Sequence, residues 1–242
     1  RRFKMKAVIL SAGRGKRLRP FTDCLPKPLL PINSEGKRVI DGVLDYLLPK
    51  CEEIFVVVGY KGELIRKHLG GYDKVKVLSI SEEEIYSGNL YTLLRAKRFL
   101  KETDFVITNA DHIFPQDVWN YFPRREKPIE ITFHSKSFRK ILEDEMKVKL
   151  NNGNFERMDK ALKDYDGAYI GITFVEKGIS EEFWKTAEEI FKTKGGTAKV
   201  EDVLNQLKEF VGIVNVDPVK FYEIDTFDDL VEVWNAHKIG GI

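Results

Sequence analysis

The first half of the chain alternates short apolar runs with stretches in which apolar residues recur at helical spacing. An unbroken apolar run of about four to eight residues between turn residues is typical of a strand that is buried on both faces. Regular alternation of strand and helix predicts right-handed crossovers and a mostly parallel sheet flanked by helices. The expected strands are 7–10, 54–58, 74–80 and 105–109, and the expected helices are 39–48, 62–69 and 88–100.

In the second half, several strands follow one another before helices return. The sequence Asn151-Asn152-Gly153 favours a tight hairpin turn between two of these strands. Asp225 or Thr226 is expected to cap a final helix that runs to about residue 237. No repeat, low-complexity tract or linker interrupts the chain, so we expect one domain over residues 1–242. The expected strands are 129–134, 146–150, 154–158, 168–174 and 211–216, and the other expected helices are 180–192 and 200–210.

Composition and charge exclude several classes of protein. The 40 Lys and Arg side chains nearly balance the 38 Asp and Glu, and the net charge of +2 argues against a nucleic-acid-binding stripe. No apolar run approaches the length of about 18 residues that a membrane span needs. Cys24 and Cys51 have neither C-x-x-C nor metal-ligand spacing, so a reducing, cytoplasmic setting is expected. Met5 is interpreted as the natural start, and residues 1–4 do not form a signal peptide.

The stretch that follows the first strand carries the first chemical signal. The strand leads directly into small residues, and the glycines among them allow positive φ and a close approach of the backbone to a ligand. Consecutive N–H groups in such a turn form a concavity that binds anions. Cationic side chains lie in the same loop, which is therefore predicted to hold phosphate. The small residues are Ser11, Ala12, Gly13 and Gly15, and the cations are Arg14, Lys16, Arg17 and Arg19.

Two common phosphate motifs do not fit this loop. There is no G-x-x-x-x-G-K-[ST], and Leu18 stands where a dinucleotide fingerprint needs its third glycine. The sequence S-A-G-R-G-K-R-L, followed by P-K-P-L, instead resembles the signature of the nucleotidyltransferases that make NDP-sugars and related activated alcohols. Lys16 and Ser11 depart from the Ser or Thr and the Ala that are usual in that family, and neither departure removes a charged catalytic group.

The resemblance extends over the whole chain, and it implies a fold. This is the nucleotidyltransferase (glycosyltransferase-A-like) fold, an α/β architecture with a Rossmann-like, mostly parallel but mixed central sheet flanked by helices. It also implies a nucleotide-binding half at about 5–127 and an acceptor-binding half at 128–242.

The resemblance further assigns catalytic roles to two cations and two carboxylates. Arg17 would contact the triphosphate and steady the pyrophosphate leaving group, and Lys27, held between two prolines, would hold the attacking and transferring phosphates together. Asp111 follows an expected strand, and ligands bind beyond the carboxyl ends of strands. Because a carboxylate and a triphosphate repel each other, a bridging Mg²⁺ is expected between them. Asp225 would complete this metal site, so Asp111 and Asp225 are the expected metal ligands. The alternative for each is a helix N-cap.

Shorter motifs assign residues to the two substrates. G-N-L-Y-T from Gly88, Asp111-His112, and K-A-L-K-D-Y-D from Lys160 resemble the inositol-1-phosphate cytidylyltransferases more than the sugar transferases. The alternatives are an N-cap for Asn89, an exposed lysine for Lys160 and helix-dipole complementarity for Glu201. His112 is expected to pack, and the alternative is a supporting position beside the metal. The expected nucleotide-binding residues are Ser11, Ala12, Gly13, Gly15, Gly88, Asn89 and Ala110, and the expected acceptor-binding residues are Lys160, Tyr169, Gly171 and Glu201.

Together these observations favour a Mg²⁺-dependent cytidylyltransferase that converts CTP and inositol 1-phosphate to CDP-inositol and pyrophosphate. A sugar-1-phosphate nucleotidyltransferase and a phosphocholine cytidylyltransferase are the alternatives within the class. A catalytically silent nucleotide-binding subunit ranks lower because all four charged catalytic positions are present, and a dinucleotide-dependent dehydrogenase ranks lower still. The expected partners are small molecules, without nucleic acid or direct membrane insertion. A homodimer and a functional link to a membrane-bound enzyme that uses CDP-inositol are left open.

Overall fold

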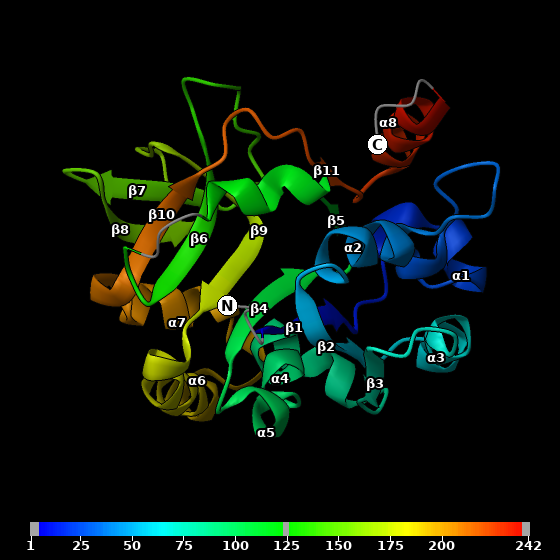
Figure 1. Ribbon diagram of the computed structural model, residues 1–242, viewed down its shortest axis with the longest axis horizontal. Coiled ribbons are helices and arrows are strands. Elements are labelled where there is room, and N and C mark those ends of the chain that lie inside the picture. Colours follow the sequence, from blue (N-terminus) through cyan, green and yellow to red (C-terminus); the bar gives the residue numbers. More distant parts are fainter. Residues whose placement is uncertain (1–4, 123–125, 239–242) are drawn as a thin grey trace.

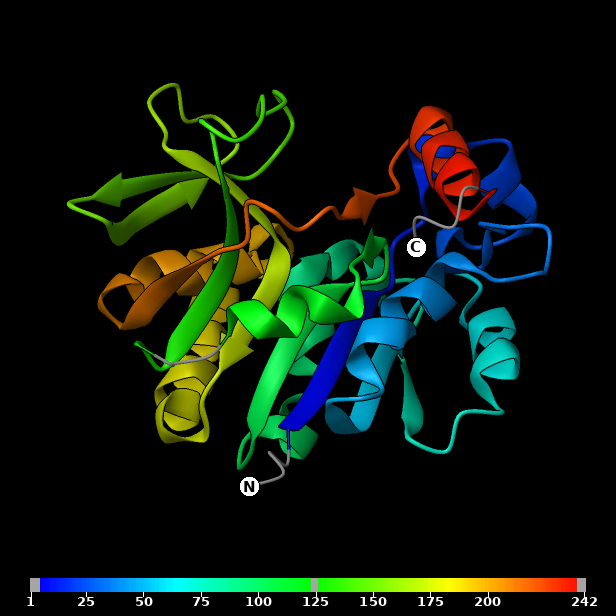
Figure 2. The same cartoon turned by 45° about the horizontal axis from the view of Figure 1, so that its top comes forward.

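The computed structural model describes residues 5–122 and 126–238, and it is built around one mixed sheet. Seven strands follow the order β10-β6-β9-β4-β1-β2-β3, and β9 alone runs against the others. Figure 2 shows β1 between β4 and β2, at the centre of the parallel part. The expected mixed, mostly parallel sheet is therefore confirmed. Its strands are β1 (Met5–Ser11), β2 (Cys51–Val58), β3 (Val75–Ser79), β4 (Asp104–Asn109), β6 (Ile129–Ser135), β7 (Lys147–Asn151), β8 (Asn154–Asp159), β9 (Gly167–Val175) and β10 (Val211–Asn215).

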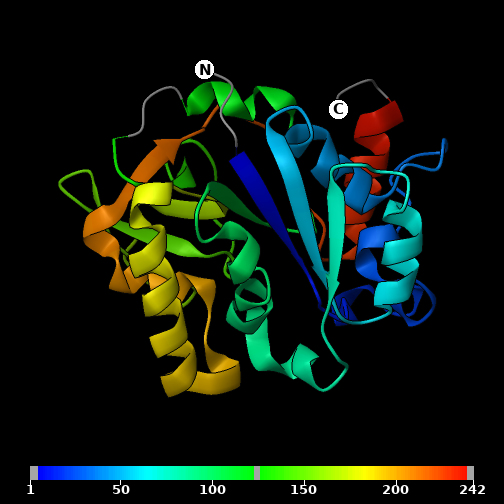
Figure 3. The same ribbon diagram turned by 60° about the horizontal axis from the view of Figure 1, so that its bottom comes forward.

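Helices cover both faces of the sheet because successive residues of each central strand point to opposite faces. In β1, Ala7 and Ile9 enter the core beneath α2, α3 and α8, whereas Val8 enters the core beneath α4 to α7. Each fully buried aliphatic side chain of this kind contributes about 1.5–3 kcal/mol. Figure 3 shows α6 and α7 beside α4 and α5 on the second face. The helices are α1 (Phe21–Cys24), α2 (Val39–Leu47), α3 (Gly62–Leu69), α4 (Gly88–Leu94), α5 (Lys97–Leu100), α6 (Ser180–Lys194), α7 (Val200–Gln206) and α8 (Phe227–Lys238).

Most expected elements form, and two helices are shorter than expected. The expected helix 88–100 is divided into α4 and α5, because the Ala96 N–H bonds to the Leu93 carbonyl three residues back and tightens the chain into a turn. The expected helix 200–210 ends at Gln206, and a 3₁₀ turn (Lys208–Phe210) continues to β10. The hairpin forms as predicted, with Asn152 and Gly153 both at positive φ.

A two-stranded ribbon lies above the carboxyl ends of the central strands. It pairs β5 (His112–Ile113) with β11 (Tyr222–Glu223) in antiparallel register, so the segment after β4 lies beside the segment before α8. At the same end, α8 lies beside α1 (Figure 1). The rings of Phe21 and Phe227 stack there with centroids 5.5 Å apart. This arrangement brings the last helix of the chain next to the loop that follows the first strand.

Within the described residues, no helix is long and apolar enough to cross a membrane. Residues 1–4, which are expected to precede the natural start, lie outside the described part of the chain.

Candidate active site

The loop after β1 packs closely against the segment that carries Thr22 and Lys27. Gly15 has φ +59°, and a Cβ placed on it would lie 3.0 Å from the Lys27 Cβ and 3.1 Å from the Thr22 Cγ2. The Thr22 hydroxyl donates a hydrogen bond to the Gly15 carbonyl at 2.9 Å. Only glycine satisfies both the positive φ and the close packing at this position. By contrast, a Cβ on Gly13 would meet no atom within 4 Å, so the loop is open on its ligand side.

The small ribbon brings the two predicted metal ligands together. Asp111 lies directly before β5 and Asp225 lies shortly after β11, and the Ile224 N–H donates to the Asp111 carbonyl at 3.0 Å. Thr226 forms the helix cap: its N–H donates to Asp229 Oδ2 at 2.6 Å and its hydroxyl to the same oxygen at 2.8 Å. Because Thr226 takes this role, the Asp225 carboxylate faces the site.

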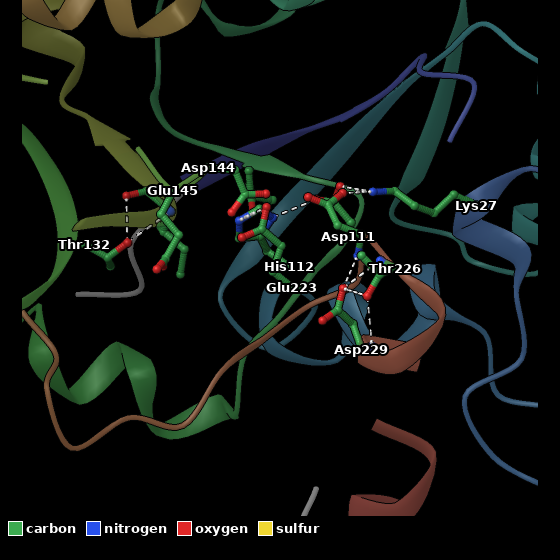
Figure 4. Close-up of polar contacts among 12 residues, drawn as sticks. Lys27, Asp111, His112, Thr132, Asp144, Glu145, Glu223, Thr226 and Asp229 are labelled. Carbon is green, nitrogen blue, oxygen red and sulfur yellow. Dashed lines mark hydrogen bonds and ion pairs between the residues drawn. The ribbon is translucent and has the colours of Figure 1, made fainter. Parts of the chain in front are cut away.

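Lys27 lies between the two carboxylates. Its Nζ donates to Asp225 Oδ1 at 2.9 Å and to Asp111 Oδ2, as Figure 4 shows for Asp111. Burial lowers the pKa of Lys27, but the charges and hydrogen bonds of Asp111 and Asp225 outweigh burial and raise it above its ordinary value. The lysine is therefore held as a cation between two anions, one from the middle of the sequence and one from near its end.

Arg17 forms a second bridge, which joins Asp225 to a third carboxylate, Asp144. Its guanidinium donates to Asp225 Oδ2 at 2.6 Å and to Asp144 Oδ2 at 3.1 Å. Burial lowers the pKa of Arg17, and the charges of Asp225 and Asp144 raise it above its ordinary value. Asp144 lies in the loop between β6 and β7, so Arg17 connects the first loop with the second half of the chain.

Asp111 is held as an anion by its neighbours. Burial alone would raise its pKa, but the positive charges of Lys27 and His112 and their hydrogen bonds lower it well below the ordinary value. His112 Nδ1 donates to Asp111 Oδ1 at 2.7 Å. Burial lowers the pKa of His112, whereas the charges of Glu223 and Asp111 raise it to about 9. His112 therefore orients the Asp111 carboxylate in addition to packing, in line with the alternative interpretation of this residue.

The alternative reading of Asp111 as a helix cap does not apply. The 3₁₀ helix Gln116–Tyr121 begins after Pro115, whose position carries no side-chain cap. Both carboxylate oxygens of Asp111 are instead used by Lys27 and His112.

A cavity of about 310 Å³ opens above the carboxyl ends of β1 and β4, within the size range of small-molecule sites. It brings together eight of the residues that the sequence assigned to catalysis, the metal and the nucleotide, along with Lys16, Asn109, Leu10 and Pro28. The eight are Ser11, Gly13, Gly15, Arg17, Lys27, Ala110, Asp111 and Asp225. Ala12 is buried beside them and does not line the cavity.

Three other predicted residues meet at the start of α4 and α7, away from this cavity. Asn89 Oδ1 accepts a hydrogen bond from the Val200 N–H at 3.2 Å, and its amide donates to Glu201 Oε2 at 3.4 Å. A Cβ on Gly88 would lie 2.7 Å from the Gly196 carbonyl oxygen, so this glycine, at φ +82°, is required by packing. Asn89, which is assigned to the nucleotide, is therefore hydrogen-bonded to Glu201, which is assigned to the acceptor.

The remaining acceptor residues lie on or near β9. The Tyr169 hydroxyl bonds to the Thr173 hydroxyl at 2.8 Å, and burial raises its pKa. A Cβ on Gly171 would lie 2.4 Å from His112 Cδ2, so this glycine makes room for the histidine that holds Asp111. The Lys160 side chain is exposed, and its backbone carbonyl accepts a hydrogen bond from Lys147 at 2.8 Å. Their roles toward an acceptor stay predictions.

The carboxylate pair fits a divalent cation that is shared with phosphate. Residues 5–122 and 126–238 contain no group of three or more His, Cys, Asp or Glu side chains placed to hold a metal. However, Asp111 and Asp225 converge on one cation, the Lys27 ammonium, at the edge of the cavity. Mg²⁺ commonly takes one or two protein carboxylates and completes its shell with water and phosphate oxygens. This donor set matches that chemistry.

Comparison with known proteins gives relatives for the first half of the chain and for most of its length. The chain is 36% identical over 116 residues to the bifunctional protein GlmU of Methanococcus aeolicus, which is 48% of this chain and 27% of that protein. The chain thus spans about a quarter of the length of that curated relative. It is 29% identical over 184 residues to the CTP:phosphoglutamine cytidylyltransferase of Campylobacter jejuni, which is 69% of this chain and 72% of that protein.

Solved structures share the fold over the whole chain. An inositol-1-phosphate CTP transferase from T. maritima superposes with a TM-score of 0.80 at 20% identity and covers 100% of this chain and 99% of that one. The CTP:phosphocholine cytidylyltransferase of Streptococcus pneumoniae superposes with a TM-score of 0.77 at 21% identity and covers 97% and 100%. The profile of one family, described as nucleotidyl transferase, matches residues 6–137, more than half of the chain. The chain therefore belongs to the nucleotidyl transferase family.

Proposed function

We propose that the chain transfers the cytidylyl group of CTP to inositol 1-phosphate and releases pyrophosphate. The observation that carries this proposal is the convergence of Arg17, Lys27, Asp111 and Asp225 on one cavity beside a glycine loop. Two cations and two carboxylates at a phosphate-binding loop are the groups that nucleotidyl transfer requires.

The reaction needs no nucleophile from the protein. A phosphate oxygen of the acceptor forms a bond to the α-phosphorus of CTP, and the bond from that phosphorus to the oxygen bridging to the β-phosphorus breaks. Pyrophosphate leaves with the bridging oxygen and its electron pair. The acceptor phosphate is already ionised near neutral pH, so the protein supplies position and charge stabilisation.

The cations act on the charge that the reaction redistributes. Lys27, which is mostly buried in the cavity lining, would neutralise the transferring phosphate, and Arg17, which is more exposed, would neutralise the departing pyrophosphate. Asp111 and Asp225 would hold Mg²⁺, which neutralises charge on the triphosphate when it is bound. His112 fixes the orientation of the Asp111 carboxylate for that role.

The choice of CTP and of inositol 1-phosphate rests on different grounds. CTP is supported by the Campylobacter jejuni relative, which uses that nucleotide by name and aligns over most of both chains. Inositol 1-phosphate is supported by the short motifs at Gly88, Asp111 and Lys160. Another phosphate monoester, such as a sugar 1-phosphate, phosphocholine or phosphoglutamine, is the second candidate for the acceptor.

The test is pyrophosphate release in Mg²⁺, with the four common nucleoside triphosphates crossed against inositol 1-phosphate, glucose 1-phosphate, phosphocholine and phosphoglutamine. Release with CTP and inositol 1-phosphate is expected. Asp111→Asn should abolish the release, and Asp73→Asn, an exposed carboxylate on the loop before β3, should leave it unchanged. Release only with another pair would replace the substrates and keep the reaction. The absence of release from every pair would overturn the proposed reaction.

A further inference from the structure

A third cation of the glycine loop is held differently from Arg17 and Lys27. The Arg14 guanidinium makes cation–π contacts with two tyrosine rings, with its Cζ 5.6 Å from the Tyr60 ring centroid and 5.3 Å from the Tyr86 ring centroid. Tyr60 follows β2, and its hydroxyl donates to the Thr22 carbonyl at 2.9 Å, which ties the ring to the loop region. The Tyr60 N–H also donates to the Ala12 carbonyl at 3.3 Å. Two hydrogen bonds therefore hold in place one of the two tyrosines that Arg14 contacts.

This contact leaves the hydrogen-bonding capacity of Arg14 unused. The five N–H donors of a guanidinium lie in its plane, where they can bond to acceptors. Across residues 5–122 and 126–238, no hydrogen bond or ion pair from the Arg14 side chain is found, and its Nε is buried without a partner. A buried donor without a partner costs about 1–3 kcal/mol. Such a group, in a loop whose residues Gly13 and Gly15 line the cavity, fits an acceptor on a ligand.

Arg14 stands in the loop that borders the cavity. Its neighbours Gly13 and Gly15 line the cavity, together with the cations Arg17 and Lys27 and the two carboxylates. Tyr86, which is 63% exposed, lies in the 3₁₀ helix Glu84–Ser87 before α4, and a Cβ on Gly59 would touch both Ile85 and the Ala12 carbonyl. Arg17 therefore lies in the part of the loop that is expected to bind phosphate, and Arg14 lies in the part that contacts two tyrosine rings.

We propose that Arg14, held against Tyr60 and Tyr86, recognises the nucleobase through two adjacent acceptors on its Watson–Crick edge. Cytosine presents such a pair, O2 and N3, whereas N3 of uracil and thymine carries a proton. Arg14 thus selects cytosine over the other pyrimidines. This inference rests on the proposed function of the cavity as a nucleoside triphosphate site, and it adds a side chain that sets the base.

The test compares kcat/KM for CTP and UTP, at a saturating concentration of the acceptor, in the wild type and in Arg14→Met. Met keeps much of the length and apolar stem of Arg and removes all five donors. The ratio of kcat/KM for CTP to that for UTP should fall at least about 10-fold, within the range that a bidentate contact supports. Tyr86→Phe keeps the stacking ring and should keep the ratio, whereas Tyr86→Ala should lower it.

Arg19→Met is the matched control. Arg19 is an exposed cation of the same loop, paired with Asp23 at 3.1 Å, so this change removes equal charge and should leave the ratio unaltered. Thermal unfolding of each variant shows that it is folded. Equilibrium binding of CTP and UTP to wild type and to Arg14→Met gives the same comparison without turnover.

The outcomes separate this inference from the proposed function. A wild type that uses CTP, with an Arg14→Met variant that keeps its preference, overturns the role of Arg14 and leaves the reaction standing. A wild type that binds CTP and UTP equally also overturns it. A protein that releases no pyrophosphate, yet loses its binding preference for CTP in Arg14→Met, supports base recognition and overturns the reaction.

Discussion

Arg17 and Asp225 are 208 positions apart in the sequence, and their side chains form a hydrogen-bonded ion pair at 2.6 Å. With Lys27 and Asp111 they make a chain of alternating charges along one edge of the cavity. In this arrangement the groups expected to bind triphosphate and metal neutralise one another. A metal–triphosphate complex carries both kinds of charge, so it can replace these internal pairs with its own.

Lys27→Met is expected to destabilise the fold, because it leaves two carboxylates facing each other with reduced compensation. We expect a loss of about 1–3 kcal/mol in the free energy of unfolding, less than for a fully buried pair because the site is open to the cavity. Millimolar Mg²⁺ should restore part of the loss, since it can stand between Asp111 and Asp225. Chemical denaturation with and without Mg²⁺ measures both effects.

Lys16→Met is the control for this change, because Lys16 is an exposed cation on the same cavity. It should change stability by less than about 0.5 kcal/mol. A Lys27→Met protein whose stability does not respond to Mg²⁺ would contradict the placing of the metal between these carboxylates.

Asp144→Asn is expected to tighten binding of the nucleoside triphosphate. Asp144 competes with phosphate for the Arg17 guanidinium, at 3.1 Å, and both side chains are more than half exposed. Exposed pairs contribute about 0.2–1 kcal/mol, so the dissociation constant should fall by up to about 5-fold. Titration calorimetry with CTP measures it, and Asp228→Asn, which changes an exposed acid near Arg17 at the start of α8, serves for comparison. Weaker binding would instead mean that Asp144 holds Arg17 in its binding position.

The sequence predicted the sheet and the charged residues of the site better than it predicted how those residues are brought together in space. The apolar runs of β1, β2 and β4 are long enough to identify, and Gly13, Gly15 and Lys27 lie in recognisable motifs. The ribbon of β5 and β11 has only two residues in each strand, too few for any periodicity. That ribbon determines the separation of Asp111 from Asp225.

The sequence could not separate binding glycines from packing glycines. The substrate roles of Gly88 and Gly171 stay predictions, and packing also requires both glycines. A Cβ on Gly88 would strike the Gly196 carbonyl, and a Cβ on Gly171 would strike the ring of His112. Such contacts join segments that are far apart in the chain. His112 was expected to pack, and its bond to Asp111 shows that a buried histidine can also position a functional carboxylate.

Gly171→Ala should damage the site through His112. The added Cβ would lie 2.4 Å from His112 Cδ2 at a backbone φ of +101°, so the ring must move and Asp111 loses its second partner. We expect a loss of about 2–4 kcal/mol in stability and at least a 10-fold loss in kcat. Gly153→Ala, in the hairpin turn at φ +81° with no atom within 4 Å of the new Cβ, measures backbone strain alone. Equal losses in the two variants would rule out the clash with His112 as the cause.

His134 should make the fold less stable in acid. It is buried on β6, its Nδ1 accepts a hydrogen bond from Arg139 Nε at 2.9 Å, and its Nε2 donates to the Val216 carbonyl at 3.1 Å. Burial and the charge of Arg139 lower its pKa below the ordinary 6.5, against the smaller opposing effects of the Val216 and Val219 backbone bonds and of Asp217. The unfolded chain therefore binds a proton at a higher pH than the folded chain does. The contribution of neutral His134 to the free energy of unfolding is complete at a pH above the unfolded pKa and is lost as the pH falls through the folded pKa. The free energy of unfolding changes by at most about 1.4 kcal/mol per pH unit through this effect.

His134→Gln isolates this effect, because glutamine can accept from Arg139 and donate to Val216 but does not titrate in this range. Urea denaturation at intervals between pH 7 and pH 4.5 gives the free energy of unfolding of both proteins. The free energy of unfolding of the wild type should fall relative to that of the variant as the pH falls below about 6.5. Titration of the other groups affects both proteins equally and cancels in this difference. Parallel curves would mean that His134 takes up its proton equally in the folded and unfolded chains, and that the Arg139 contact does not hold it neutral.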